Sequence, residues 1–514
     1  MKRAVGALLA LVLLSSIAPR AARADDAASL LAKHRAFVGW QFGDGSLNSL
    51  KASGHTTKDD GTTASTFVER RAGIGWRRDT HNVARNTDSS AGFTGRIFWA
   101  TNDSGFIRPE LGDLQKYNIA RDLIFNEATS TMTGTLRGTK DIDGKTYSIV
   151  RVASDVAYPI DLYVDPATGA YGRAVIDPDG TYETTVNIDA YAEAAPGKKI
   201  VSKWRYDDSK SVSTYDQIAG NAPVTNEDLH PPGQTAQWSF ANGKSFPIVF
   251  RDSDTDYDHA IYVDAVVNGV KGHFVMDTGA SGFFFTQGFA GKAKLKRIDS
   301  SSASGIGGDV KTEVDRVDTM AFGDNVLSNV IVSAGKVDFG GRFDGLIGFD
   351  LFAGAVVSVD LDKRTMTLYD PKAFEAQQQG FVLTVDLSEQ VPQIPMKVNG
   401  STDVIALLDS GDSGDVDISN QLTTRYGVRM LVDNSASGYL KSHKGFSGVG
   451  GVEVDDCGRL DSVSVGPISY TDAPACKSPS FYGRQILVGF DFIKNFNLIF
   501  NYPQAQLILI PRKQ

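Results

Sequence analysis

The feature that most constrains the fold is a pattern that occurs twice in the second half of the chain. An apolar run ends in Asp277-Thr278-Gly279, and a second apolar run, residues 404–408, ends in Asp409-Ser410-Gly411. One such triplet is a weak signal, because a given tripeptide occurs by chance in a chain of this length with odds of roughly one in ten. The residues around the two triplets also repeat in the same order, and such repeats indicate repeated structure. We therefore expect two related lobes with an approximate twofold relation.

The repeat extends on both sides of the triplets. Each copy opens with a strand-like run that ends in Asn-Gly, at residues 261–269 and 394–400, and this is a strong hairpin signal. Each copy later has an apolar segment that ends in Gly-Phe-Asp, and then a predicted hairpin at residues 356–369 or 498–510. Between the triplet and this segment lies a glycine cluster, Gly305-Ile306-Gly307-Gly308 in the first copy and Gly448-Val449-Gly450-Gly451 in the second.

Together these motifs resemble the pepsin and retropepsin aspartic proteases, especially the retroviral-type enzymes with short lobes. In that family each lobe supplies one catalytic aspartate from an apolar-apolar-Asp-Thr/Ser-Gly turn, and a glycine-rich hairpin forms a flap. The resemblance covers about residues 245–511, roughly half of the chain. It implies that the two glycine clusters are flaps that bind substrate. It also implies a catalytic pair, Asp277 and Asp409, held in place by Thr278, Gly279, Ser410 and Gly411.

The residue types suit peptide hydrolysis without a metal or another cofactor, and we expect neither. Two carboxylates close together share one proton, because both cannot ionise cheaply at that distance, as is established for aspartic proteases. Glycine after the hydroxyl residue lets two turns approach without Cβ clashes. The hydroxyl groups of Thr278 and Ser410 are able to hydrogen-bond across the two lobes and fix the carboxylates.

The two copies differ directly after the triplet. The family's usual small residue is present as Ala280 in the first copy, whereas the second copy has Asp412. A third carboxylate near the pair would disfavour its ionisation, and the alternative is a side chain that points to solvent. This difference leaves two functions open. The chain is either an active aspartic endopeptidase or a catalytically inactive binding protein that uses a protease-shaped module for lipid, lipoprotein or protein partners.

Residues 1–24 have the pattern of a secretory signal peptide. A basic start at Lys2 and Arg3 precedes an apolar run, residues 4–17, and a small-x-small cleavage site at residues 22–24. The alternative is a membrane anchor, but this run is shorter than the about 18 residues that a span requires, and no other run is longer. We therefore expect a periplasmic or secreted protein with no transmembrane segment in its mature chain.

The balance of charge argues against one class of partner. The formal net charge is −9, and it becomes −13 when the four basic residues of the signal segment are removed. Nucleic-acid-binding proteins usually carry a basic surface, so we expect no nucleic acid as a partner. Peptide or protein substrates are expected from the resemblance.

The rest of the chain predicts a mainly β protein, in which an antiparallel N-terminal domain with one or two helices precedes the two-lobed acid-protease β-barrel fold. We expect this domain at residues 25–235, the first lobe at 236–375 and the second lobe at 376–514. A helix is expected at residues 27–38, and a proline-containing linker at 218–237. The strand-like run at residues 160–176 resembles the half-barrel of LolA-like lipoprotein carriers. That resemblance implies a lipid or lipoprotein ligand, and the alternative is an unrelated domain without a ligand.

Three smaller signals complete the analysis. Cys457 and Cys476, both in the second lobe, are expected to form a disulfide, with two free thiols as the alternative, because their spacing fits no zinc pattern. His273 is expected to be a structural residue, because four positions along a strand place it about 13 Å from Asp277. The segment at residues 411–414 is similar to a serine-protease nucleophile, but no histidine stands in the context that such enzymes require.

Overall fold

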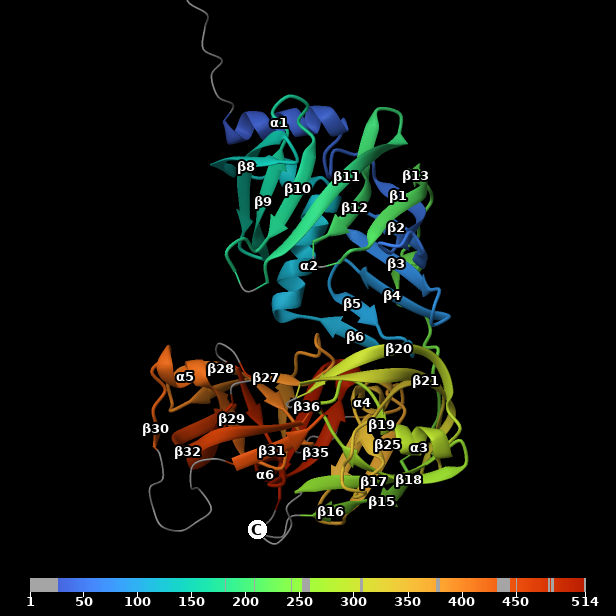
Figure 1. The fold of residues 1–514 in the computed structure, drawn as a ribbon, viewed down its shortest axis with the longest axis vertical. Helices are drawn as coiled ribbons and strands as arrows, with labels where there is room; N and C mark the ends of the chain where they lie inside the picture. The colour runs from blue at the N-terminus through green and yellow to red at the C-terminus, as the bar shows by residue number, and fades with distance from the viewer. Residues whose placement is uncertain are drawn as a thin grey trace, which may run out of the picture.

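The computed structural model describes residues 26–512 except 181, 208, 242, 252–258, 306–307, 376–379, 432–443, 450, 479–480 and 482–484. The predicted signal segment therefore lies outside the described residues. The described chain is mainly β, which confirms the predicted fold class, and its strands form sheets of 13, 9, 6 and 8 strands (Figure 1). None of the helices in these residues has the length and apolar character needed to cross a membrane.

The 13-stranded sheet contains the whole N-terminal strand run, and its paired strands are antiparallel. Sequence neighbours lie side by side in it, and β1 also pairs with β13, so β6 and β7 become the two edges. Its strands are β1 (Ser49–Thr57), β2 (Thr63–Ala72), β3 (Gly75–Asn82), β4 (Thr87–Phe93), β5 (Phe98–Thr101), β6 (Ile107–Glu110), β7 (Gly134–Ile142), β8 (Lys145–Ser154), β9 (Ala157–Val164), β10 (Tyr171–Ile176), β11 (Thr184–Ala195), β12 (Lys198–Tyr206) and β13 (Val212–Gly220).

Two helices pack against this sheet. Helix α1 (Ala27–Val38) has the predicted bounds, because the Asp26 side chain accepts a hydrogen bond from the Ser29 N–H and Gly39 ends the helix with a φ of 77°. Helix α2 (Gly112–Phe125) was not placed by the sequence. Both helices contribute to one apolar core with the sheet, through residues that include Leu30, Leu31, Val38, Ala120, Ile124, Leu162 and Trp204.

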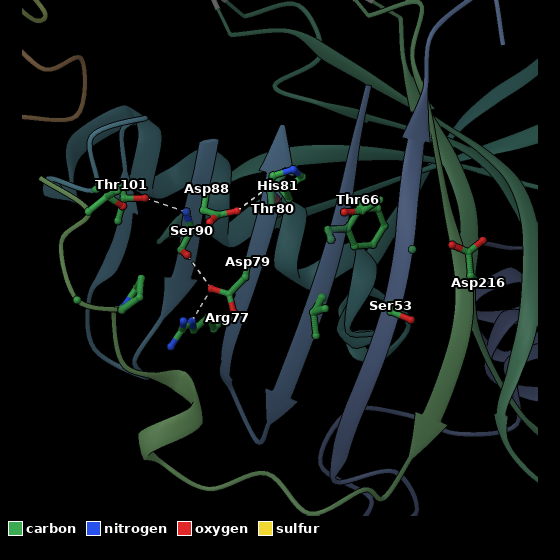
Figure 2. Close-up of a pocket in the computed structure, with 17 residues that line it drawn as sticks. Ser53, Thr66, Arg77, Asp79, Thr80, His81, Asp88, Ser90, Thr101 and Asp216 are labelled. Atoms are coloured by element: carbon green, nitrogen blue, oxygen red, sulfur yellow. Dashed lines mark hydrogen bonds and ion pairs between the residues drawn. The ribbon is translucent and has the colours of Figure 1, made fainter. Parts of the chain in front are cut away.

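A cavity of about 610 Å³ lies beside strands β1 to β4 (Figure 2). Its charged side chains on β3 and β4 are paired with one another, and Asp216 of β13 is paired with His55 outside the lining. The carboxylate of Asp79 accepts hydrogen bonds from Arg77 Nε (2.7 Å) and Ser90 Oγ (2.6 Å), and His81 Nδ1 lies 2.8 Å from Asp88. The other polar residues of the lining are Ser53, Thr66, Thr80, Thr101, Asp216 and Thr235. Phe67, Val68 and Pro232 add apolar surface, so the lining is mixed and indicates no class of ligand.

The second half of the chain contains two sheets with the same local plan. In the nine-stranded sheet β18 pairs in parallel with β23, and in the eight-stranded sheet β28 pairs in parallel with β34. The predicted Asn-Gly turns precede β18 and β28, and their positive φ values are 47° and 83° at Asn268 and Gly269, and 49° and 71° at Asn399 and Gly400. The repeated sequence therefore folds into repeated structure.

The strands of the nine-stranded sheet are β14 (Gln237–Ser239), β16 (Val249–Arg251), β17 (Ala260–Val267), β18 (Val270–Met276), β19 (Phe284–Thr286), β20 (Lys296–Gly305), β21 (Gly308–Phe322), β22 (Asn325–Gly335) and β23 (Gly345–Ile347). Those of the eight-stranded sheet are β27 (Gln393–Val398), β28 (Thr402–Leu408), β29 (Val416–Ser419), β30 (Met430–Leu431), β31 (Lys444–Gly448), β32 (Gly451–Val465), β33 (Ile468–Ser478) and β34 (Gln485–Val488). Short helices α3 (Gln287–Lys292), α4 (Phe349–Gly354), α5 (Asn420–Thr424) and α6 (Phe490–Ile493) complete the lobes.

The six-stranded sheet joins the two lobes. The first lobe contributes β15 (Ser245–Pro247), β24 (Val356–Asp360) and β25 (Thr365–Tyr369), and the second contributes β26 (Phe381–Thr384), β35 (Phe496–Asn501) and β36 (Gln506–Pro511). The seam is the antiparallel pair β24–β35. The two hairpins predicted at 356–369 and 498–510 are thus both present, and they meet.

Two predicted connections need correction or stay open. The linker expected from residue 218 starts later, because Ile218 and Gly220 still pair with Ala52 and Leu50 in the sheet. The segment 227–229 is a short 3-10 helix. The predicted boundary between the two lobes falls at residues 375 and 376, and residues 376–379 lie outside the described residues. The domain boundaries stay a prediction.

Candidate active site

The two triplets occupy equivalent places at the ends of β18 and β28. The N–H of Asp277 donates to the carbonyl of Ile347 (2.9 Å), and the N–H of Asp409 donates to that of Val488 (2.9 Å). Ile347 and Val488 are the last residues of β23 and β34, the strands that lie parallel to β18 and β28. The apolar segment before each Gly-Phe-Asp therefore supports the aspartate of its own lobe.

The hydroxyl residues of the triplets connect the two lobes. The N–H of Thr278 donates to Ser410 Oγ (3.1 Å), and the N–H of Ser410 donates to Thr278 Oγ1 (2.9 Å). Each hydroxyl also donates across the interface, Thr278 to the carbonyl of Leu408 and Ser410 to that of Met276, both at 2.7 Å. Both side chains are buried. These four bonds fix the two turns against each other.

The glycines let the two carboxylates meet. A Cβ atom on Gly279 would lie 2.4 Å from Oδ2 of Asp409, and one on Gly411 would lie 2.5 Å from Cγ of Asp277. Both distances are too short for a real side chain, so only glycine fits at either position. Because each glycine packs on the carboxylate of the other lobe, Asp277 and Asp409 face each other across the interface.

The surroundings of the pair favour one shared proton. Burial raises the pKa of Asp277 well above its ordinary value, and the neighbouring charge of Asp409 raises it further. Burial also raises the pKa of Asp409, against the effect of the Gly411 N–H, which donates to its Oδ1 (2.8 Å). Among the described residues, Oδ1 of Asp277 has no hydrogen-bond partner. Both shifts favour a state in which the two carboxyls hold one proton between them.

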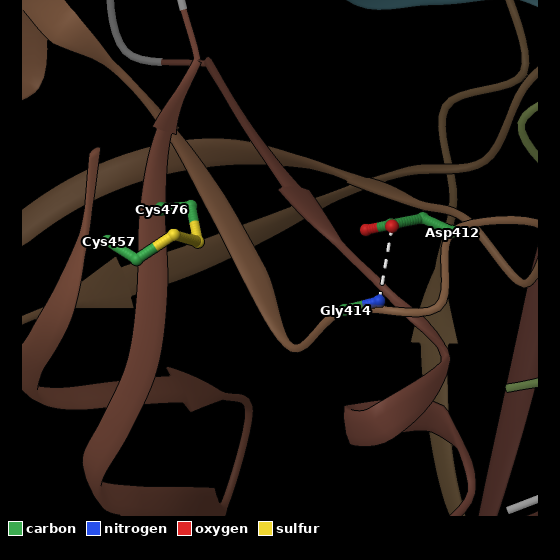
Figure 3. The surroundings of a disulfide bond; sticks show 4 residues. All are labelled: Asp412, Gly414, Cys457 and Cys476. Atoms are coloured by element: carbon green, nitrogen blue, oxygen red, sulfur yellow. Dashed lines mark hydrogen bonds between the residues drawn. A yellow bond between two sulfur atoms is a disulfide. The ribbon is translucent and has the colours of Figure 1, made fainter. Parts of the chain in front are cut away.

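Asp412 does not point to solvent, so that alternative of the sequence analysis is wrong. Its side chain is buried, and its Oδ1 accepts a hydrogen bond from the N–H of Gly414 (3.1 Å; Figure 3). A Cβ on Gly489 would lie 2.6 Å from Asp412 Oδ2, and a Cβ on Gly348 would lie 2.8 Å from that of Ala280. The carboxylate of Asp412 thus occupies the place that the small residue has in the first lobe.

The cysteines form the predicted disulfide, which joins directly paired residues of β32 and β33 (Figure 3). His273 is placed in a structural setting, because its Nδ1 lies 2.8 Å from Asp264 of the neighbouring strand β17.

The two glycine-rich hairpins come together at their tips. A Cβ on Gly305, in the hairpin of β20 and β21, would lie 2.5 Å from the carbonyl oxygen of Val449, in the hairpin of β31 and β32. Gly305 and Val449 also line the cavity that contains the two aspartates. Of the other expected flap residues, Gly308, Gly448 and Gly451 belong to the hairpin strands, whereas Ile306, Gly307 and Gly450 lie outside the described residues.

The cavity over the aspartates measures about 1490 Å³, and the N-terminal part of the chain forms one of its walls. This wall was not predicted. It contains Arg85 and Arg108, and the loop residues between β5 and β6, Asn102, Asp103 and Ser104. In Figure 1 the strands β5 and β6 lie at the end of the N-terminal sheet that faces β20 and β21.

The loop between β5 and β6 is anchored to the first lobe. Asn102 Nδ2 donates to Asp350 Oδ1, and Ser104 Oγ accepts from the N–H of Ile331 (2.9 Å). Phe106 is fully buried in the apolar core of the two lobes. Burial raises the pKa of Asp350 to about 7, although the hydrogen bonds from Asn102 and the Phe283 N–H act in the opposite direction. The N-terminal part is therefore integrated with the lobes.

Comparison with known proteins gives a family for one segment. Residues 263–351 match the family described as aspartyl protease, and this segment includes the triplet that begins at Asp277. No curated protein matches the chain.

Solved structures resemble the N-terminal part. A LolA-superfamily protein from Nitrosomonas europaea has 16% identity and a TM-score of 0.30, and the alignment covers 40% of this chain and 98% of that one. A DUF1329-family protein from Desulfovibrio piger has 13% identity and a TM-score of 0.29, with 40% and 95% covered. These similarities concern the fold, and we take no functional argument from them.

Proposed function

We propose that this protein is an aspartic endopeptidase whose catalytic pair is Asp277 and Asp409, and the match of residues 263–351 to the family described as aspartyl protease supports this. The observation that carries the proposal is the reciprocal packing of Gly279 on Asp409 and Gly411 on Asp277. It holds two buried carboxylates face to face, one from each lobe. A binding module would gain nothing from this arrangement, because bringing two buried carboxylates together costs free energy.

The proposed reaction uses the single proton of the pair. Asp409 takes a proton from a water molecule as the water oxygen attacks the scissile carbonyl carbon, and Asp277 gives its proton to the carbonyl oxygen. The resulting gem-diol then collapses. Its C–N bond breaks, the amine nitrogen takes the proton from Asp409, and a hydroxyl of the gem-diol returns a proton to Asp277. The products are a carboxylic acid and an amine, and the pair regains its starting state.

The cleft suits an extended peptide as the substrate. The tips at Gly305 and Val449 meet over the cavity and present backbone groups to it. Strand edges bind extended peptides through main-chain hydrogen bonds, largely independently of sequence. We therefore propose that Gly305, Gly308, Gly448 and Val449 belong to flaps that close over the substrate.

We place the enzyme in the periplasm or outside the cell. The support is the signal-like pattern of residues 1–24 and the disulfide between Cys457 and Cys476, since disulfides persist in oxidising compartments. The competing function, an inactive carrier of lipid or lipoprotein, has no specific observation in its favour. The cavity beside β1 to β4 has a mixed lining of hydroxyls, charged groups and apolar side chains, and helices α1 and α2 contribute to the apolar core of that sheet.

The test is hydrolysis of an unstructured protein by the purified chain and by two variants, Asp277→Asn and Asp409→Asn. Each variant should fall to background, because one carboxyl cannot act as both base and acid, while its melting temperature stays close to that of the wild type, because the amide has nearly the shape of the carboxyl that it replaces. The matched control is Asp264→Asn, which changes a half-exposed aspartate of β17 outside the cavity. Near-normal turnover by either active-site variant would rule out the proposed pair.

A further inference from the structure

We propose that Arg108 forms an anion-binding subsite of the catalytic cleft, which selects substrates that carry a carboxylate near the scissile bond. The carboxylate comes from an acidic side chain or from a free C-terminus of the peptide. The inference rests on the proposed function and names the substrate class that the cleft prefers.

The first support is the way in which the chain holds Arg108 at the cleft. Arg108 lies on the edge strand β6 and lines the same cavity as Asp277 and Asp409. On one side of it, Asn102 and Ser104 are hydrogen-bonded to the first lobe. On the other side, the N–H of Leu111 donates to Ser388 Oγ of the second lobe (2.8 Å). A strand fixed at both ends presents its side chains to the cleft in a defined place.

The second support is the weak pairing of this guanidinium. Its side chain is only 17% exposed, and its ion-pair partner Glu110 lies 3.4 Å away. The other oxygen of Glu110 accepts a hydrogen bond from Asn118 (2.7 Å). Within the described part of the chain, Arg108 Nε has no hydrogen-bond partner. A largely buried cation therefore has one long ion pair and one donor, Nε, that no described residue satisfies.

The other arginine that the N-terminal part places in this wall, Arg85, is better matched. Arg85 is held by Asp103 at 2.6 Å and by Asp299 at 3.0 Å, so its charge is already balanced. Asp350 accepts from Asn102, and Asp412 accepts from the Gly414 N–H. Neither of these carboxylates has a hydrogen bond from Arg108 among those that the structure contains.

A carboxylate is the ligand that these donors fit. A guanidinium presents donors in a planar fork that matches the two oxygens of a carboxylate, and such bonds are stronger when they are partly buried. A substrate carboxylate would also offset the cost of keeping an under-paired cation away from water. The structure therefore assigns Arg108 to recognition of substrate rather than to folding alone.

The experiment compares peptides that differ in one charge. Peptide libraries with a single Glu moved along the sequence, and matched libraries with Gln, are prepared with free and with amidated C-termini. Cleavage by the full chain is measured as kcat/KM, and binding of non-hydrolysable hydroxyethylene analogues is measured by calorimetry. The enzymes are the wild type, Arg108→Met, Arg108→Lys and the control Arg137→Met. Arg137 is an exposed residue of β7, the opposite edge of the same sheet.

We expect the wild type and Arg137→Met to prefer Glu over Gln at one position, or a free over an amidated C-terminus, by about 10- to 100-fold. Arg108→Met should lose this preference while it still cleaves or binds the neutral peptides, and Arg108→Lys should keep part of it. A preference for Glu over Gln would identify an acidic side chain as the source of the carboxylate. A preference for the free over the amidated C-terminus would identify the C-terminal carboxylate.

Equal kcat/KM values of the wild type for charged and neutral peptides would overturn the proposed subsite. An unchanged preference for the charged peptides in Arg108→Met would overturn it as well. The binding assay separates this result from failure of the proposed function. If no variant hydrolyses peptide but the Arg108-dependent preference persists in binding, the subsite stands and the endopeptidase does not.

Discussion

Asp350 allows a quantitative test of how the N-terminal part is joined to the first lobe. Its carboxyl is buried, accepts a hydrogen bond from Asn102 and has its pKa raised to about 7, from an ordinary value of 3.8. The group is protonated in both the folded and the unfolded chain below pH 3.8. As the pH rises from there to about 7, the unfolded chain releases the proton while the folded chain keeps it. The folded state therefore loses stability over this range.

The expected size follows from linkage. Each pH unit in the range costs about 1.4 kcal/mol, so the wild type loses about 4 kcal/mol between pH 3.8 and 7 through this group. Asp350→Asn removes the titration. The amide replaces one acceptor oxygen by a donor, and this costs about 1 kcal/mol at every pH. The variant should thus be slightly less stable than the wild type at pH 4 and about 3 kcal/mol more stable above pH 7.

The assay is equilibrium unfolding in denaturant at pH 4, 5.5 and 7.5, with the difference between variant and wild type taken at each pH. All other titrating groups are common to the two proteins, so this difference isolates Asp350. The control is Asp491→Asn, at the equivalent Gly-Phe-Asp position of the second lobe. Asp491 is paired with Lys494 (2.6 Å) and His259 (2.7 Å), so its replacement should destabilise the chain. A stability difference for Asp350→Asn that stays constant with pH would refute the reasoning.

Three further predictions concern the lobes. Ser410→Ala removes two interlobe hydrogen bonds and leaves the buried Thr278 N–H without its acceptor. The free energy of unfolding should therefore fall by about 1–3 kcal/mol, and kcat should fall with it. An unchanged melting temperature and kcat would show that these hydrogen bonds do not hold the two triplets together. A negative charge on Asp412 would raise the upper apparent pKa of the catalytic pair, so Asp412→Ala should move the alkaline limb of the pH–rate profile to lower pH. An unmoved limb would show that the charge of Asp412 does not affect the pKa of the pair. Phe106→Ala should cost about 3–5 kcal/mol in chemical denaturation, because it empties a site in the core of the lobes, and a cost below 1 kcal/mol would mean that the loop is not anchored there.

Local patterns predicted the parts of this structure that depend on short sequence segments. The sequence predicted the Asn-Gly turns, the start of α1 at its Asp26 cap and the repeated order of strands, because each of these depends on neighbouring residues. The repeat aligned Asp412 with Ala280, but it did not decide between a carboxylate near the pair and one that points to solvent.

Contacts between residues far apart in the chain could not be predicted from such local patterns. Phe106 follows a polar turn, and only Ile107 next to it is apolar, so no periodicity in the sequence indicated that Phe106 enters the core of the lobes. Helix α2 was missed because its N-terminus has no side-chain cap and its buried residues include the polar Asn118. The wall with Arg108 depends on long-range contacts of the β5–β6 loop with the first lobe, which the sequence does not indicate.

The two Gly-Phe-Asp segments, described above as equivalent, have acquired different partners. Asp350 receives Asn102 from the N-terminal part, while Asp491 is bound by His259 and Lys494. In a symmetric dimer of identical subunits, each substitution appears in both subunits. A binding position for an additional domain that arises in one subunit would therefore also arise in the other. Covalent fusion removes that constraint. One Gly-Phe-Asp segment can then bind the N-terminal part while the other keeps an ion pair within the lobes. Because all of these parts belong to one chain, each cleft has one N-terminal part whatever the protein concentration.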